Sequence, residues 1–277
     1  MKKSGPSFIG IGASFSGLGV ITKCLAAHPQ VSDTIPAYNF FSSDAFTKKG
    51  LLWYEAHSAT IDPAILSGDC SPIYLVTKGV AEKIVKSYPD TKIFVVVRNP
   101  IDRALAEYEH AKANRRVSSQ ISCVRYLTTV PTAQTNSFYG QHLHEYFAYY
   151  SSLQLHVIVY EELVENPLKV MQALYGFLDI DTAFIPKLMA RYAPPADEPK
   201  HPSKLYRLRK LISRLVKKMM DKPPVAIFPP TLPQSAYLEA SQLTALAAAY
   251  AVDARHLSNL LHRDMEVFWN LAPGVEK

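Results

Sequence analysis

The sequence predicts an α/β fold: a P-loop-like, doubly wound, mostly parallel sheet flanked by helices, with a C-terminal helical extension. Two apolar runs, Ile93–Val97 and Leu155–Tyr160, have the length and the β-branched content of parallel strands covered on both faces. Each run is followed by a segment with helical periodicity, and such alternation is typical of doubly wound sheets. A third short apolar run, Phe8–Ile11, leads through a loop of small residues into the helical pattern of Val20–Ala27.

Length and composition fit one soluble domain. The chain has 277 residues, of which 48% are hydrophobic and 19% charged, with a net charge of +6. We expect a single domain over 1–277, with a core at 7–192, a basic linker and helix at 193–222 and a C-terminal helical segment at 223–277. The longest apolar runs are strand-sized, well below the ~18 residues that span a bilayer.

Cysteine usage indicates a reducing compartment and no metal framework. Cys24, Cys70 and Cys123 are odd in number, widely spaced and without a CxxC pair. We therefore expect a cytoplasmic protein with free thiols. A secretory signal is the competing interpretation of the N-terminus, but the apolar stretch Phe8–Ile21 is interrupted by glycines and serines and lacks a prompt cleavage site.

The stretch Ser7–His28 indicates a phosphate-binding loop. A strand, the small-residue loop Gly12–Gly19 and a helix follow one another, so several backbone N–H groups converge where the helix dipole is positive. The loop is not a Walker A motif, because it contains no lysine. Lys23 comes a turn later and is either a surface lysine or a side chain that reaches back to a phosphate.

A second strand end points to the same chemistry. The strand Lys92–Val97 runs directly into Arg98, and then Asn99 and Pro100 have the residue types of a helix cap and a first helical position. Ligands of open α/β sheets bind beyond the carboxyl ends of the strands. An arginine that ends a buried strand is poorly explained as solvated surface, so we predict that Arg98 binds an anion.

The remaining pattern gives the other elements. We expect helices at Lys48–His57 (burying Leu51, Leu52 and Tyr54), Val80–Ser87, Ala104–Lys112, Tyr139–Ser151 and from Asn166 to Leu178. We expect a strand end that turns into a loop at 68–74, irregular structure at 31–41, a surface excursion at 115–135 and a turn at 161–163. The C-terminal part should hold a Pro-rich linker at 194–202, a basic helix at 204–220 and a helical pair at 232–250 and 254–263.

The order of these landmarks resembles the PAPS-dependent sulfotransferase family, especially the bacterial branch related to heparan-sulfate-type sulfotransferases. The fragments that carry the resemblance are FIGIGASFSGLG, LAAHPQV, SPIY, KIFVVVRNPIDRALAEYEH, VIVYEELVENPLKVMQALYGFLDI, SKLYRLRKLISRLVKKM and YAVDARHLSNLLHRDMEVFW. They cover nearly the whole chain, and RNPIDRA joined to a buried strand is the most specific of them.

The resemblance implies transfer of a sulfonyl group from PAPS, leaving PAP, to a hydroxyl or amine of a glycan, lipid or small metabolite, without a metal. It implies a loop lysine that neutralises the bridging phosphate, a Glu or His base, and an arginine and a serine that hold the 3′-phosphate. The donor-binding residues predicted on this basis are Ser14, Phe15, Ser16, Gly17, Leu18, Gly19, Arg98 and Arg207.

The chain departs from the family pattern at the positions that carry the chemistry. Phe15 stands at the loop lysine, Ala37 at the base, and Cys70 at the lysine before Ser71. Leu18 and Gly19 replace a small hydroxyl pair, and Ala106 replaces the 3′-phosphate serine. Such losses typically lower rates ~10²–10⁴-fold each. The catalytic residues are therefore unknown, and the chain is either an enzyme with substitutes or a pseudo-sulfotransferase with a binding or scaffolding role.

Substitutes for the base can be named, each beside a structural alternative. The first candidates are Asp69 and His57, and Asp44 and Glu55 are weaker ones. Asp69 could instead be a turn-forming or helix-capping aspartate, and His57 and Glu55 could belong to a solvated helix face. In the basic segment, the family resemblance implies that Lys200, Lys204 or Arg207 contacts the phosphates of the nucleotide. Alternatively, helix 204–220 would lie on an anionic membrane as a peripheral contact. We expect no nucleic-acid partner.

Overall fold

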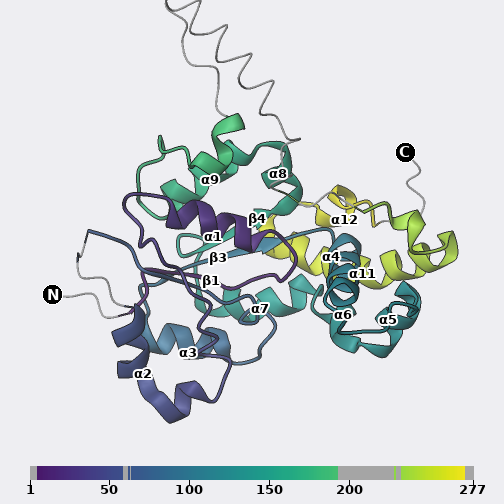
Figure 1. The fold of residues 1–277 in the computed structure, drawn as a ribbon, viewed down its shortest axis with the longest axis horizontal. Helices are drawn as coiled ribbons and strands as arrows, with labels where there is room; N and C mark the ends of the chain where they lie inside the picture. The colour runs from purple at the N-terminus through teal and green to yellow at the C-terminus, as the bar shows by residue number, and fades with distance from the viewer. Residues whose placement is uncertain (1–4, 59–61, 63, 193–227, 229–231, 272–277) are drawn as a thin grey trace, which may run out of the picture.

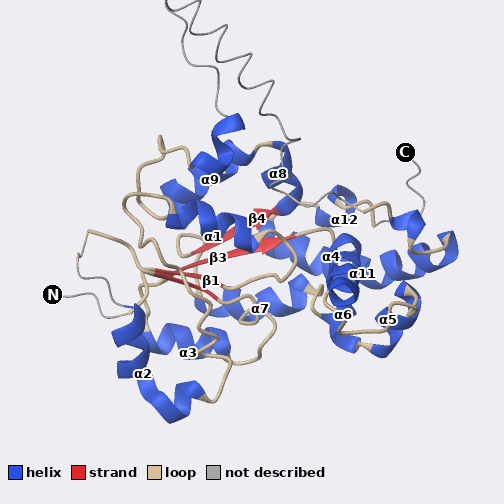
Figure 2. Ribbon diagram, viewed as in Figure 1, coloured by secondary structure: helices blue, strands red, loops and turns tan. Residues whose placement is uncertain are grey.

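A four-stranded parallel sheet organises the molecule, of which the computed structural model describes residues 5–58, 62, 64–192, 228 and 232–271. The strands are β1 (Phe8–Gly10), β2 (Gly68–Cys70), β3 (Lys92–Val97) and β4 (Leu155–Val159), in the order β2-β1-β3-β4. β1 pairs with β2 on one side and β3 on the other, so Phe8 lies beside both Gly68 and Lys92. The predicted fold class, a doubly wound parallel sheet, is confirmed (Figure 2).

Helices cover both faces of this sheet (Figure 1). The helices before β4 are α1 (Leu18–Ala26), α2 (Ala45–Ser58), α3 (Val80–Ser87), α4 (Pro100–Ala113), α5 (Cys123–Thr129), α6 (Pro131–Thr135) and α7 (Tyr139–Tyr149). Those after it are α8 (Tyr160–Glu165), α9 (Pro167–Phe177), the 3-10 turns η1 (Lys187–Tyr192) and η2 (Gln234–Ala236), α11 (Ala240–Leu261) and α12 (Met265–Phe268). In Figure 1, α1 and α9 lie on one side of the sheet and α3 and α7 on the other.

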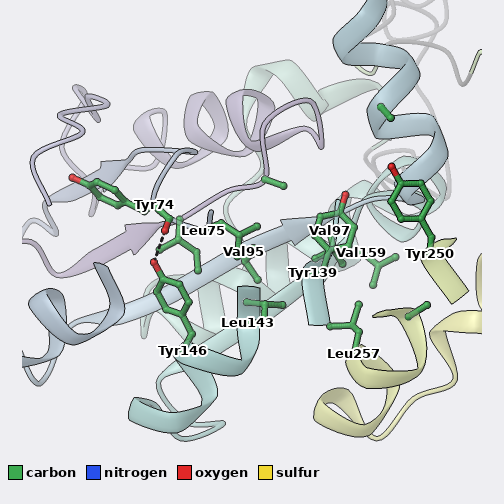
Figure 3. Packing of buried hydrophobic residues seen from close by; sticks show 14 of the residues in the cluster. Tyr74, Leu75, Val95, Val97, Tyr139, Leu143, Tyr146, Val159, Tyr250 and Leu257 are labelled. Carbon is green, nitrogen blue, oxygen red and sulfur yellow. Dashed lines mark hydrogen bonds between the residues drawn. The ribbon is translucent and has the colours of Figure 1, made fainter. Parts of the chain in front are cut away.

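The continuous apolar run of β3 serves both faces. Ile93, Val95 and Val97 belong to the larger buried cluster, which the α7 residues Leu143 and Tyr146 also enter (Figure 3). Phe94 and Val96 belong to a second cluster with residues of α1 and α9. Since side chains alternate along a strand, a central strand must be apolar at every position to fill two cores.

The start of α4 follows the predicted capping chemistry. The Asn99 side chain accepts hydrogen bonds from the backbone N–H groups of Ile101 and Asp102, and Pro100 occupies the first helical position. One turn further, Arg103 is fully buried and forms an ion pair with Glu107 at 2.6 Å. The cap fixes the point at which the chain leaves β3, and with it the position of Arg98.

Several predicted elements are corrected. The segment 115–135 is a surface excursion in part only, because it contains α5 and α6, whose buried residues pack on α4. The expected turn at 161–163 is the helix α8, which begins at Tyr160, the residue expected to end the strand. On α2, Tyr54 is buried as predicted, but Leu52 is 83% exposed. The expected C-terminal pair is one helix, α11, followed by the short α12.

Two sequence predictions lie outside the described residues: the Pro-rich linker at 194–202 and the basic helix at 204–220, which includes Arg207. Within the described residues, no helix has the length and apolar character needed to cross a membrane.

Candidate functional site

A cavity of about 680 Å³ opens at the carboxyl ends of β1 and β2. Its wall consists of the loop after β1, the start of α1, two residues of the segment between α1 and α2, and the end of β2. The lining residues are Ala13, Ser14, Phe15, Gly17, Leu18, Gly19, Val20, Thr22, Lys23, Ile35, Ala37, Cys70 and Pro72. The volume lies in the range of small-molecule sites, and the position is where open α/β sheets bind ligands.

The loop presents unused backbone donors to this cavity. Within the described part of the chain, the N–H groups of Ser14, Phe15, Gly17, Leu18 and Gly19 donate no hydrogen bond, and all of these residues line the cavity. By contrast, Ser16 is fully buried, and its N–H donates to the carbonyl oxygen of Ala13. Free N–H groups at a helix N-terminus favour an anion, because the helix dipole adds positive potential there.

Unusual backbone conformations shape the loop. Gly17 caps α1 with φ of 92°, and a Cβ at this position would lie 2.9 Å from the Tyr160 ring. Phe15 also has positive φ, 66°, and its ring packs on His110 of α4 with centroids 5.2 Å apart. Positive φ is uncommon for a bulky residue and persists only where the surroundings hold it. The loop therefore has one enforced shape.

Arg98 lies beneath the loop and is hydrogen-bonded to it. Its Nη1 donates a hydrogen bond to the carbonyl oxygen of Phe15 at 3.1 Å, and its guanidinium carbon lies 4.5 Å from the centre of the Tyr160 ring. The side chain is 1% exposed and is not among the residues that line the cavity. Nε has no partner among the described residues. The structure thus joins the two predicted anion-binding features, but it places the arginine under the loop. Anion binding by Arg98 itself stays a prediction.

Asp69 is the centre of a buried hydrogen-bond network at the end of β2. Its carboxylate accepts hydrogen bonds from the hydroxyls of Ser71 (2.5 Å), Tyr74 (2.8 Å) and Tyr54 (3.0 Å), and from the Tyr38 backbone N–H (3.3 Å). The residue is fully buried, and burial raises the pKa of the carboxyl. All four groups that donate to the carboxylate belong to the protein itself.

The same network holds the segment that passes the cavity at Ala37. Ser71 Oγ accepts from the Asn39 N–H at 2.9 Å, and the Tyr74 hydroxyl accepts from the Phe41 N–H at 3.3 Å. Asp69 therefore positions this wall of the site through the backbone. Asp69 lies within β2, so it is not the turn-forming or helix-capping aspartate considered as its structural alternative. A role as catalytic base stays a prediction.

Of His57 and Cys70, two further residues that the sequence singles out, only Cys70 lines the cavity. His57 is exposed near the end of α2, where its Nδ1 lies 2.7 Å from the Trp53 carbonyl oxygen, and it does not line the cavity. Cys70 does line it, but burial raises the pKa of its thiol to about 12, so the nucleophilic thiolate is scarce. Within the described residues, no group of His, Cys, Asp and Glu could hold a metal ion.

Sequence reasoning missed a residue that supports the loop, Tyr160, and two residues that line the cavity, Thr22 and Ile35. The sequence pattern predicts that Tyr160, on which Arg98 stacks, ends a strand, and no local pattern marks an aromatic ring that contacts a distant arginine. Thr22 and Ile35 line the cavity without belonging to any motif. For Lys23, the sequence offered both a surface role and a phosphate role, and the structure places it at the cavity wall.

The open parallel sheet with this loop defines a doubly wound α/β protein of the sulfotransferase fold. The sulfotransferase domain family matches residues 13–193, well over half of the chain, and the protein therefore belongs to that family. The predicted resemblance is confirmed.

Curated relatives are distant. Heparan sulfate glucosamine 3-O-sulfotransferase 5 of Homo sapiens is 28% identical over 185 residues, which cover 63% of this chain and 54% of the human protein. The Mus musculus protein of the same name is 27% identical with the same coverage. The chain thus spans about half the length of the curated relatives it matches.

Solved structures support the fold. A sulfotransferase from Alicyclobacillus acidocaldarius superposes with a TM-score of 0.67 at 20% identity, covering 96% of this chain and 98% of that one. Mouse sulfotransferase SULT7A1, in a crystal structure complexed with PAP, gives 0.56 at 14% identity, covering 93% of this chain and 88% of that one.

Proposed function

We propose that this protein binds PAPS in the cavity at the end of β1 and transfers its sulfonyl group to a hydroxyl or amine of an acceptor. The observation that carries the proposal is the set of free loop N–H groups, on Ser14, Phe15, Gly17, Leu18 and Gly19, that line a cavity of nucleotide-compatible size. Family membership supplies the reaction class, since sulfotransferases use PAPS as donor.

The transfer is a direct displacement at sulfur. The bond between sulfur and the bridging oxygen of the phosphosulfate breaks, a bond between sulfur and the acceptor oxygen or nitrogen forms, and the acceptor proton passes to a base or to solvent. Negative charge grows on the phosphate of the departing PAP. Loop N–H groups stabilise that charge, because they are fixed before the reaction and need no reorganisation.

The acceptor class follows by analogy. The curated relatives are named for a glucosamine hydroxyl of heparan sulfate, so a glycan hydroxyl is the first acceptor class to examine. Lipids and small metabolites follow. Ala37 is exposed and lines the cavity, so an acceptor would approach beside a side chain that cannot take a proton.

A second candidate function is nucleotide binding without transfer. Phe15, Ala37 and Cys70, at the places where the family resemblance implies a lysine, a base and a second lysine, all line the cavity, and all are uncharged. Removal of such groups lowers rates ~10²–10⁴-fold each, so a protein without substitutes for them would keep a ligand and lose the reaction.

Calorimetric titration with PAP, followed by transfer assays with radiolabelled PAPS across glycan, lipid and phenolic acceptors, tests both functions. Gly19→Leu is the site control: Gly19 is exposed, and a Cβ there meets nothing within 4 Å, so leucine narrows the cavity without a clash at the backbone. Gly176→Leu on α9 is the matched variant, since Gly176 is also an exposed helical glycine and lies outside the cavity.

We expect PAP binding that Gly19→Leu weakens and Gly176→Leu leaves unchanged. Transfer to any acceptor supports the enzyme. PAP binding without transfer to any acceptor class favours the second function. No binding of PAP by the wild-type protein overturns both.

A further inference from the structure

Lys23 is distinguished by its charge. Among the described residues that line the cavity, it is the one with an ionised side chain, and the others are apolar, small or hydroxyl-bearing. Arg98, which donates a hydrogen bond to the loop, is buried beneath it. A phosphosulfate carries negative charge on both its phosphate and its sulfate, so a cation in this cavity would strengthen its binding.

The geometry of α1 directs Lys23 towards the loop. In a helix, side chains lean towards the N-terminus, so a residue covers the surface one turn before its own Cα. The residue one turn before Lys23 is Gly19, which has no side chain and has open space around it. The lysine stem can therefore lie across Gly19, which brings the ammonium towards the unused N–H groups of the loop.

Lys23 also has no ion-pair partner among the described residues. It is exposed. Its position in the last turn of α1 provides the alternative role, a favourable interaction with the helix C-terminus. That role would affect the stability of the helix, but it would not depend on which phosphate a ligand carries.

We propose that Lys23 binds the 5′-phosphosulfate group of the donor and neutralises the phosphate as the sulfonyl group leaves. The inference rests on the proposed function and deepens it, because it names the residue that replaces the cation missing at Phe15. The lysine acts as a point charge on a flexible stem, so a site on α1 serves as well as one within the loop.

The test compares two nucleotides on four proteins. PAP carries both a 3′- and a 5′-phosphate, and adenosine 3′-phosphate lacks the 5′-phosphate that Lys23 is proposed to bind. Both are titrated calorimetrically into the wild type, Lys23→Gln, Lys23→Arg and Lys86→Gln. Lys86 is the matched control, since it is an exposed lysine in the last turn of α3 and does not line the cavity.

We expect Lys23→Gln to weaken PAP binding about 10-fold, the usual scale of a charge-assisted contact, and to leave the affinity for adenosine 3′-phosphate unchanged. Lys23→Arg should retain most of the affinity for PAP, and Lys86→Gln should match the wild type. If glutamine prevents folding, Lys23→Met is compared in its place.

Equal effects of Lys23→Gln on the two nucleotides, or no effect on either, would overturn the inference and leave the proposed function standing as long as the wild type binds PAP. Failure of the wild type to bind PAP would overturn the proposed function, and the inference with it. The two failures are thus distinguished by the wild-type titration alone.

Discussion

The guanidinium of Arg98 donates a hydrogen bond to the carbonyl oxygen of Phe15, 83 positions earlier in the chain, at 3.1 Å. Arg98 is the first residue after β3, and Phe15 lies in the loop after β1, the neighbouring strand. The bond therefore ties the end of one strand to the loop that follows the other. The ring of Tyr160, the first residue after β4, packs against the same guanidinium.

Arg98→Met should destabilise the fold by about 2–4 kcal/mol, since it removes a charge-assisted hydrogen bond and a desolvated cation–π contact. It also leaves buried Asp102 without the nearby positive charge that counteracts the effect of burial on its pKa. Urea denaturation followed by circular dichroism measures the change. Arg125→Met, at an exposed arginine of α5, is the control. A loss below about 1 kcal/mol would show that Arg98 does not hold the loop.

Two glycines of the loop and first helix should respond to alanine with opposite signs. Gly17→Ala places a Cβ 2.9 Å from the Tyr160 ring at a φ of 92°, so we expect a loss of about 1–3 kcal/mol. Gly19→Ala puts a better helix former at an open position of α1, so we expect a gain of up to about 1 kcal/mol. Thermal unfolding of the two variants against the wild type measures both. Changes of the same sign would contradict the described loop conformation.

Asp69→Asn should destabilise the protein by about 2 kcal/mol or more. The amide nitrogen of asparagine cannot accept a hydrogen bond, whereas both carboxyl oxygens of Asp69 do: they accept from the hydroxyls of Ser71, Tyr74 and Tyr54 and from one backbone N–H. Asp90→Asn, at an exposed turn, is the control. Chemical denaturation gives the free energies of unfolding. If Asp69→Asn and Asp90→Asn changed the free energy of unfolding equally, Asp69 would not be the centre of a stabilising network.

The effect of Asp69→Asn on the free energy of unfolding should depend on pH. Burial raises the pKa of Asp69 above its ordinary value of 3.8, so the folded protein binds this proton more tightly than the unfolded chain does. Its contribution to stability is therefore complete below about pH 4 and declines as the pH rises through the raised pKa. The difference in unfolding free energy between the wild type and Asp69→Asn should shrink from about pH 4 towards neutrality. A difference that grows over this range would reverse the assigned direction.

The three cysteines should resist alkylation in the folded protein. Burial raises the thiol pKa to about 12 at Cys24 and Cys70 and to about 11 at Cys123. At about pH 8, only roughly one thiol in a thousand or fewer is then ionised, and the thiolate is the reactive form. Iodoacetamide labelling followed by mass spectrometry should modify all three in denaturant and leave them largely unmodified without it. Rapid labelling of Cys70 in the native state would show that its thiol is more acidic or more accessible than its burial indicates.

The fold was predictable wherever one local pattern determined an element. β3 and α3 follow from a continuous β-branched run and an amphipathic octet, and both lie where they were predicted. The Asn99–Pro100 cap of α4 is also confirmed, but the helix begins at Pro100, before the expected Ala104. Segment 115–135 was harder, because α5 and α6 are short helices that owe their stability to packing on α4. In the C-terminal part, α11 crosses a stretch that the sequence suggested as a break.

The site was predictable in its location but not in its chemistry. Parallel strands followed by a Gly/Ser loop place a cavity at their carboxyl ends, and it is there. Whether Arg98 faces that cavity or lies under the loop depends on the Tyr160 ring and on the Phe15 carbonyl, which come from other parts of the chain. Likewise, the partners of Asp69 come from α2, the preceding segment and the following turn, so no spacing rule identifies them.

β1 has only three residues, yet it is bracketed on both sides by pairing with β2 and β3. The backbone that leads into the loop is therefore set by its neighbours and owes little to the loop's own side chains. Exposed side chains that line the cavity, such as Ala37, can change without disturbing that frame. The architecture separates the part of the protein that holds a ligand from the part that would act on it, so a lineage can alter or abandon the reaction while the scaffold persists.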